Sequence, residues 1–217
     1  MDLEEIYKNR FSGNKVLNEK NNIWKILCKH FFQRYIAEDS VLVDVGAGYC
    51  EFLNNIKAKK KYGFDLNPES KNFANDDVEF ANKSIFDIEL NEKANVVFVS
   101  HVLEHLSSKE EVINALKKFN QILKDKGKVI ILTPNITLLG GRYWDFIDHK
   151  VPLNDLSIIE AGKLTGFECT KNIKRFLPYT TKSKIPKFGF LIWLYLKTLT
   201  ISGFFMGKTS FIVLEKV

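Results

Sequence analysis

The stretch VLVDVGAGYCEFL, residues 41–53, decides the fold of this chain. The run VLVDV suits a buried strand and leads directly into Gly46, Ala47 and Gly48. Glycine lets the backbone turn sharply after a strand and lets a ligand approach it closely. Where a dinucleotide-binding fingerprint has its last glycine, this chain has Glu51. A bulky anion there opposes a pyrophosphate, so we expect the turn to hold a ligand other than a dinucleotide.

Around this stretch, short apolar runs alternate with segments of helical periodicity from Val41 to Thr133. This βαβ rhythm is typical of an α/β fold with a parallel sheet. A helix is expected after the glycine turn and another over residues 108–123. The other expected elements are the strands VLVDV, KKYGFD, VEFA, NVVFVS, KVIILT, 167–176 and TSFIVLE, the helices 23–36 and 155–164, and a long loop over 134–152.

Two aspartates mark the ends of the first two expected strands. Asp44 lies near the end of the first, and Asp65 ends the second about twenty residues later, where a carboxylate accepts hydrogen bonds from a ribose diol. Strand, glycine turn and acidic strand end together predict a nucleoside-cofactor site. Because Glu51 disfavours nicotinamide and flavin dinucleotides, we expect S-adenosylmethionine, which has no phosphate and carries a cationic sulfonium.

The runs VDVGAGYCEF, YGFDLNP, SHVLEHL and IILTPN resemble, in order over residues 40–135, the class I S-adenosylmethionine-dependent methyltransferases. RYWDFIDHKVPLNDLSIIEAGKLTGFE and RFLPYTTKSKIP are similar to a bacterial subgroup often found beside polysaccharide genes. The resemblance implies a Rossmann-like, doubly wound, seven-stranded sheet that is mostly parallel, with one antiparallel strand near the edge. It also implies that the cofactor lies across the strand ends.

The resemblance assigns cofactor contacts by position. Cys50 falls at the third glycine of the generic GxGxG turn, and Asp87 is the alternative to an adenine-binding aspartate that many relatives have near residue 84. The implied contacts are Asp44, Gly46, Ala47 and Gly48 for the methionine part, Asp65 for the ribose, Leu66, Ser84 and Ile85 for adenine, and Ser100 and His101 near the methyl group.

Candidate catalytic residues follow from the chemistry of methyl transfer. The sulfonium is already an activated electrophile, so the protein must hold the acceptor and take up its proton where needed. His101 follows the fourth strand, and His149 lies in the loop after the fifth, preceded by Asp148, which we expect to orient it. An imidazole titrates near neutrality. Either histidine can also serve as a hydrogen-bonding wall, so both roles stay open.

The sequence HVLEH, residues 101–105, matches the HxxEH of zinc peptidases. In those enzymes both histidines lie on one helix face, whereas NVVFVS makes His101 a strand-end residue. We therefore expect no metal site and interpret Glu104 and His105 as residues that hydrogen bond locally at a helix start.

The loop over residues 136–154 is the candidate acceptor loop. Paired glycines permit a mobile lid, and aromatic and charged side chains suit a sugar or another polar small molecule. The same aromatics also suit simple packing of the loop onto the sheet, and both interpretations stay open. The candidates are Arg142, Tyr143, Trp144 and Asp145.

The segment FGFLIWLYLKTLTISGFFMG, residues 188–207, is close to membrane-spanning length, but Lys197 and its glycines interrupt it, and the strand TSFIVLE after it is needed to complete the sheet. We expect the apolar insertion over 185–207 to be either a lid over the acceptor site or an interfacial helix that docks on a membrane. In the second case Lys182, Lys184 and Lys187 would face anionic lipid.

Bulk properties agree with one domain over residues 1–217, with a helical cap over 1–40 and a cofactor-binding core over 41–135. MDLEEIYKNR at the N-terminus has no apolar run, so we expect a cytoplasmic location. Cys28, Cys50 and Cys169 are expected to be free thiols. The net charge of +6 is too small to single out nucleic acid.

The sequence thus predicts a methyltransferase for a small-molecule acceptor, with an oxygen of a glycan, glycolipid or their precursor as the favoured target. Two alternatives stay open, namely a non-catalytic partner subunit that binds S-adenosylmethionine and an RNA methyltransferase. The tripeptide TPN lacks the asparagine, proline, proline, aromatic arrangement of amino-methylating nucleic-acid enzymes, which disfavours nucleic acid.

Overall fold

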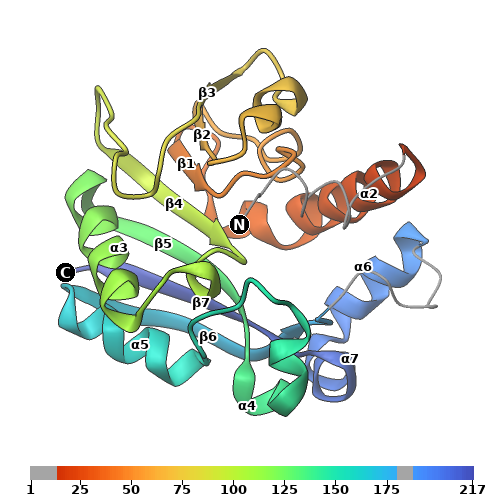
Figure 1. The fold of residues 1–217 in the computed structure, drawn as a ribbon. Coiled ribbons are helices and arrows are strands. Elements are labelled where there is room, and N and C mark those ends of the chain that lie inside the picture. The colour runs from red at the N-terminus through yellow and green to blue at the C-terminus, as the bar shows by residue number, and fades with distance from the viewer. Residues whose placement is uncertain (1–13, 180–187) are drawn as a thin grey trace.

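A computed structural model describes residues 14–179 and 188–217 of the chain, and a seven-stranded sheet runs through it in the order β3-β2-β1-β4-β5-β7-β6 (Figure 1). The first five strands are parallel, and β7 runs antiparallel to both of its neighbours. The α/β, doubly wound fold is therefore confirmed. The strands are β1 (Val41–Val45), β2 (Lys60–Phe64), β3 (Val78–Ala81), β4 (Ala94–Ser100), β5 (Leu123–Pro134), β6 (Phe167–Leu177) and β7 (Thr209–Lys216).

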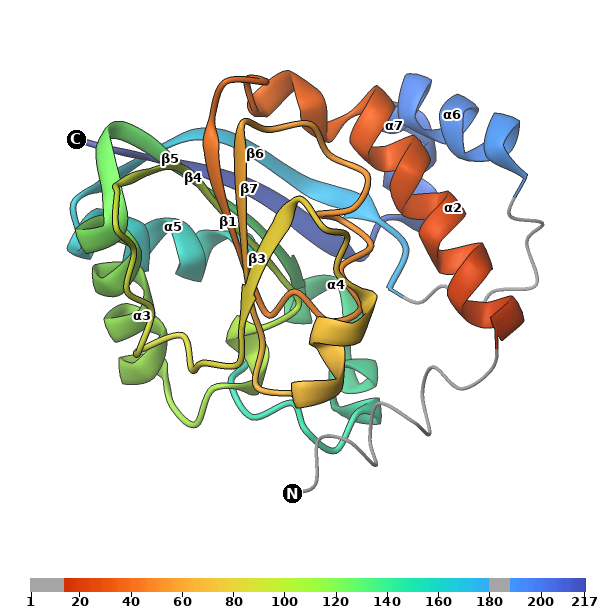
Figure 2. The same ribbon diagram turned by 90° about the horizontal axis from the view of Figure 1, so that it is seen from above.

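Helices cover both faces of the sheet. Figure 2 shows α3 and α5 on one side and α2, α6 and α7 on the other. Each face has its own apolar cluster: Val41 and Val43 belong to the cluster under α3 and α5, and Leu42 between them belongs to the cluster under α2, as the period of a strand requires. The helices are α2 (Asn14–His30), α3 (Lys109–Ile122), α4 (Ile136–Leu139), α5 (Asp155–Leu164), α6 (Gly189–Lys197) and α7 (Leu199–Met206).

Two expected helices are corrected. The helix expected over 23–36 begins at Asn14 and ends at His30, and the chain continues as the 3-10 turn η1 (Phe32–Tyr35). The helix expected after the glycine turn is absent, since residues 46–59, all of which the structure describes, form turns. The long loop expected over 134–152 contains α4 and the 3-10 helix η4 (Gly140–Asp145).

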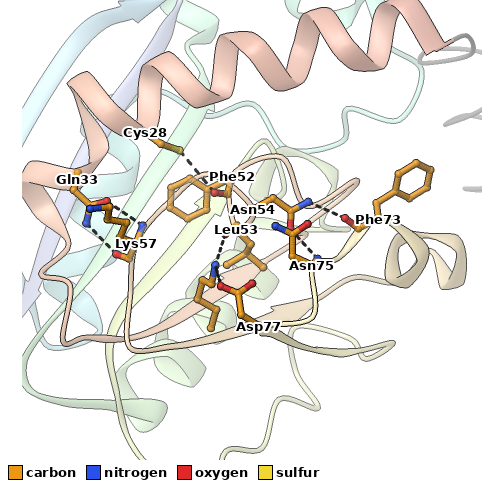
Figure 3. Close-up of polar contacts among 10 residues, drawn as sticks. Cys28, Gln33, Phe52, Leu53, Asn54, Lys57, Phe73, Asn75 and Asp77 are labelled. Atoms are coloured by element: carbon orange, nitrogen blue, oxygen red, sulfur yellow. Dashed lines mark hydrogen bonds and ion pairs between the residues drawn. The ribbon is translucent and has the colours of Figure 1, made fainter.

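Side chains fix the segment between β1 and β2 in place of a helix (Figure 3). Asn54 donates its amide to the carbonyl of Phe73 at 2.8 Å and accepts from the backbone of Asn75 at 3.0 Å. Gln33 holds Lys57 in the same way, through one bond to its carbonyl at 2.9 Å and one from its N–H at 3.0 Å. Asparagine side chains compete with helical backbone bonds, which explains why this segment forms anchored turns.

The apolar insertion between β6 and β7 forms α6 and α7. Helix α6 packs against α2, and α7 packs against β6. Within the described residues no single helix is long and apolar enough to cross a membrane, and α6 and α7 reach that length and composition only as a pair, bent by 104°. Lys182, Lys184 and Lys187 lie outside the described residues.

Candidate active site

The glycine turn after β1 lies at the carboxyl end of the parallel strands. Gly46 and Gly48 have φ angles of 72° and 53°, in the left-handed region that favours glycine. The N–H groups of Gly46 and Ala47 both donate to the carbonyl of Phe64, at 2.8 and 3.0 Å, and tie the turn to the end of β2. A Cβ on Gly46 would overlap Cγ2 of Val102. Both the backbone angle and the close packing therefore require glycine at position 46.

Cys50 stands at the third glycine position of the generic turn and keeps the backbone of a glycine, with φ of 58°. For a residue with a side chain this conformation costs about 1–2 kcal/mol. The side chain is fully buried in the cluster under α2, and its thiol faces the carbonyl of Ser70 at 3.9 Å. Packing of the buried cysteine offsets part of the backbone strain, so the turn keeps its shape without the third glycine.

Three carboxylates are buried around the turn, on Asp44, Glu51 and Asp65. Burial raises the pKa of Asp44 well above its ordinary value, and the charges of Asp65 and Glu51 raise it further. Glu51 forms an ion pair with Lys20 of α2 at 2.9 Å. The electrostatic field of this cluster disfavours a diphosphate and favours a cationic ligand.

Asp65 joins the turn to the end of β2. Its Oδ2 accepts from the N–H of Gly48 at 2.7 Å, and its Oδ1 accepts from the N–H of Asn67 at 2.8 Å. Burial raises the pKa of Asp65, and these backbone bonds partly counter that effect. Each carboxylate oxygen has a second lone pair, so the side chain can still accept hydroxyl donors. Leu66 beside it is 57% exposed and offers an apolar face at the same edge.

The turn after β3 completes this side of the site. Ile85 is buried, while Ser84 is half-buried and its hydroxyl accepts from the N–H of Phe86 at 3.3 Å. Two further residues here were not predicted from the sequence. The amide of Asn82 donates to the carbonyl of Asp65 at 2.7 Å, and Phe86 is partly exposed. The position of Asn82 directly after β3 was the one signal that could have indicated it.

His101 leaves β4 in a left-handed conformation, with φ of 57°, and its N–H donates to the carbonyl of Leu132 at 2.9 Å. Ser100 before it is half-buried at the strand end. The His101 side chain is 39% exposed, and its Nδ1 lies 3.3 Å from Oε1 of the fully buried Glu104. Burial acts to raise the pKa of Glu104, but the close contact and charge of His101, together with the charge of His105, outweigh it and hold the pKa below its ordinary value. An ionised carboxylate thus lies beneath a solvent-accessible imidazole.

His149 is oriented differently from the prediction. Its Nδ1 contacts the carbonyl of Tyr143 at 2.8 Å, whereas Oδ2 of Asp148 lies 3.4 Å from Nδ1 of His105. The expectation that Asp148 orients His149 is therefore corrected, because the backbone of Tyr143 has that role. Burial lowers the pKa of His149. His101, which is more exposed and has an ionised partner, has the better geometry for a base.

The candidate acceptor residues divide into two groups. Tyr143 is fully buried, and its hydroxyl donates to the carbonyl of Val151 at 2.6 Å and accepts from the N–H of Leu153 at 3.3 Å, so its expected contact with the acceptor is corrected to a packing role. The other three residues lie at the surface of η4. They are Arg142, Trp144 and Asp145.

Comparison with known proteins identifies the family. Residues 24–178 match the family described as a methyltransferase domain. The chain belongs to this methyltransferase family. No curated protein sequence matches the methyltransferase.

Solved structures share the fold of this methyltransferase at low sequence identity. A methyltransferase dependent on S-adenosylmethionine from Archaeoglobus fulgidus is 18% identical, with a TM-score of 0.67 over 99% of this chain and 100% of that one. A possible histamine N-methyltransferase from Thermotoga maritima is 15% identical, with a TM-score of 0.68 over 98% and 99%. An S-adenosylmethionine-dependent methyltransferase from Clostridium acetobutylicum is 12% identical, with a TM-score of 0.64 over 98% and 97%.

The methyltransferase is a class I enzyme, and its cofactor is S-adenosylmethionine. The residues at the strand ends fit this cofactor. The buried carboxylates suit its cationic sulfonium and ammonium groups, and Asp65 retains lone pairs for hydroxyl donors beside an exposed apolar side chain at Leu66.

Proposed function

We propose that this methyltransferase methylates an oxygen of a small-molecule acceptor, with His101 as the general base. S-adenosylmethionine supplies an activated methyl group when it is bound. The single observation that supports the proposal is the contact of 3.3 Å between Nδ1 of His101 and Oε1 of Glu104. An ionised, buried carboxylate orients the imidazole and stabilises the imidazolium that forms when Nε2 accepts the hydroxyl proton.

We further propose a glycan, a glycolipid or one of their precursors as the acceptor. Support comes from the likeness of residues 142–168 and 175–186 to the polysaccharide-associated subgroup and from the loop after β5. Arg142 and Asp145 are exposed, and Nε of Arg142 lies 3.8 Å from Oδ2 of Asp145. Trp144 is half exposed. Charged groups beside an aromatic side chain suit a sugar ring, which has polar edges and an apolar face.

The test is incubation of the purified enzyme with labelled S-adenosylmethionine and a metabolite extract of the source organism, followed by identification of the labelled product. We expect a labelled polar glycan or glycolipid. Labelling of RNA, or of an amine in place of a hydroxyl, would contradict the proposal. His101→Gln should abolish most of the labelling without loss of cofactor binding.

The surface of α6 and α7 supports a second proposal, docking on an anionic membrane from the cytoplasmic side. Large apolar side chains are exposed along both helices, and α6 has no buried residue. Such a face is costly in water and suits the headgroup boundary of a bilayer. The exposed residues are Phe188, Phe190, Leu191, Leu194, Ile201, Phe204 and Phe205.

A basic groove of about 570 Å³ lies beside this apolar face. The guanidinium of Arg175 lies 5.4 Å from the ring centre of Phe204 and joins the groove to the apolar face. Among the described residues that line the groove there is no carboxylate. Its cations suit anionic lipid headgroups. They are Arg34, Lys171, Lys174, Arg175 and Lys197.

Vesicle sedimentation separates membrane docking from the lid interpretation. We expect binding to vesicles that contain phosphatidylglycerol, weaker binding to pure phosphatidylcholine, and loss of binding in the double variant Phe204→Ser, Phe205→Ser. Leu156→Ser is the matched control, since Leu156 is an exposed apolar residue of α5. No binding to anionic vesicles would remove the membrane proposal and favour the lid.

A further inference from the structure

Glu104, His105 and His149 come together beside the proposed base. Each side chain offers one potential ligand atom, and these three atoms all lie within 4.8 Å of one another. The centroids of the two imidazole rings are 5.0 Å apart. The 3-10 turn η3 (Leu103–His105) carries the first two residues. The N–H groups of Lys150 and Val151 donate to the carbonyl of Glu104 at 2.8 and 3.0 Å, and these bonds hold the distant loop against η3.

Both histidines keep one ring nitrogen that can bind a metal ion. Nδ1 of His105 lies 3.0 Å from the carbonyl oxygen of Asp148, and Nδ1 of His149 lies 2.8 Å from the carbonyl oxygen of Tyr143. A carbonyl only accepts, so each Nδ1 carries the hydrogen and each Nε2 keeps its lone pair in the neutral ring. Metal-binding histidines are held in this way, with one ring nitrogen fixed by a carbonyl or carboxylate.

Glu104 supplies the charge. Its side chain is fully buried, and its contact with Nδ1 of His101 at 3.3 Å falls short of good hydrogen-bond geometry, so neither carboxylate oxygen is fully satisfied among the described residues. The imidazole of His101, 3.3 Å from Oε1, is charged only when it is protonated. Burial of a carboxylate without strong partners is costly, and a cation in contact with it removes that cost.

We propose that Glu104, His105 and His149 bind a divalent transition-metal ion, with Zn²⁺ as the representative. Two imidazoles and one carboxylate are ligands that suit Zn²⁺ and its first-row neighbours, and they leave a position for water or an acceptor oxygen. Metal–nitrogen bonds near 2.0 Å require ligand atoms about 3.3 Å apart, so the side chains close inward when the ion binds. His105 is partly exposed and provides the way in.

This proposal departs from the expectation of no metal site. In the HxxEH of zinc peptidases both motif histidines are ligands and the glutamate is the base. In this protein Glu104 is a proposed ligand, and His149, from the loop after β5, takes the ligand position that the first histidine of the motif, His101, would have in a peptidase. The proposal concerns binding alone and does not depend on the acceptor or on the role of His101 as a base.

The test is calorimetric titration of untagged, chelator-treated protein with Zn²⁺, repeated with Co²⁺ and followed by visible absorption. We expect one ion per chain, and His105→Gln and His149→Gln each to weaken binding by at least about a hundredfold. His30→Gln is the control, since His30 is an exposed residue at the end of α2. It should bind as the parent does.

Circular dichroism confirms that each variant is folded, and the partly exposed His105 makes its variant the safer one. The Co²⁺ spectrum should show nitrogen and oxygen ligands and should disappear in the His105 variant. No saturable binding by the folded parent, or binding that is unchanged in both histidine variants, would overturn the proposal.

Discussion

Replacement of Asp65 tests whether the end of β2 is both a structural and a cofactor-binding position. In Asp65→Ala the N–H groups of Gly48 and Asn67 lose acceptors at 2.7 and 2.8 Å. Each of the two unsatisfied donors costs about 1–3 kcal/mol, so we expect the free energy of unfolding to fall by about 2–6 kcal/mol.

The same substitution should weaken cofactor binding. A charge-assisted bond to a ribose hydroxyl contributes about 1.5–3 kcal/mol, which corresponds to about a ten- to hundredfold loss of affinity for S-adenosylmethionine. Calorimetric titration below the melting temperature of the variant measures this affinity in folded protein, and thermal denaturation measures the stability loss separately. Asp76→Ala is the matched control, because Asp76 is an exposed aspartate in the loop before β3.

Stability and affinity have separate outcomes in this experiment. Loss of stability with unchanged affinity in the folded variant would mean that Asp65 only anchors the turn, and would refute its assignment to the ribose. Unchanged stability would contradict the hydrogen bonds at the turn.

Three further predictions concern the base, the buried acid and the turn. His101→Gln should lower the turnover number by about 10²–10⁴-fold in the methylation assay, while the cofactor dissociation constant changes little. Burial, followed by the charges of Asp65 and Glu51, raises the pKa of Asp44, so the apo protein should lose stability as pH rises from the ordinary aspartate value through the raised one. Over the same interval S-adenosylmethionine should bind more tightly as Asp44 ionises. Calorimetric titration should find a smaller increase in affinity with pH for the Asp44→Asn variant, and also when S-adenosylhomocysteine replaces S-adenosylmethionine as the ligand. Gly46→Ala should cost about 2–4 kcal/mol in chemical denaturation, because its Cβ overlaps Val102 at positive φ, whereas Gly141→Ala, with no atom within 4 Å of its Cβ, should cost almost nothing.

Most of the strands were predictable because each contains a short apolar run. However, β5 begins at Leu123, before the expected run KVIILT, and β6 is largely polar. Helix α2 was misplaced because its first turns are polar and are held by tertiary contacts, such as Lys20 with Glu51 and Asn21 with Asn55. The prediction of a helix after the glycine turn was wrong for a related reason, because the side chain of Asn54 forms hydrogen bonds with the backbone of Phe73 and Asn75. Local periodicity does not record such long-range contacts.

The site shows the same division. The glycine turn and Asp65 were predictable, because their chemistry depends on residue type and on spacing along one βαβ unit. The cluster of Glu104, His105 and His149 was not, because it depends on backbone bonds from Lys150 and Val151 to the carbonyl of Glu104. Residue type also failed to indicate that Tyr143 is buried while its neighbours are exposed.

Calorimetry with S-adenosylmethionine, S-adenosylhomocysteine and a nicotinamide dinucleotide tests the central claim most directly. The account predicts that the first two bind one per chain and compete with each other, and that the dinucleotide does not bind. It also predicts that the sulfonium compound gains more from ionised Asp44 than the neutral thioether does. Binding of the dinucleotide, or no binding of either adenosyl compound by folded protein, would contradict it.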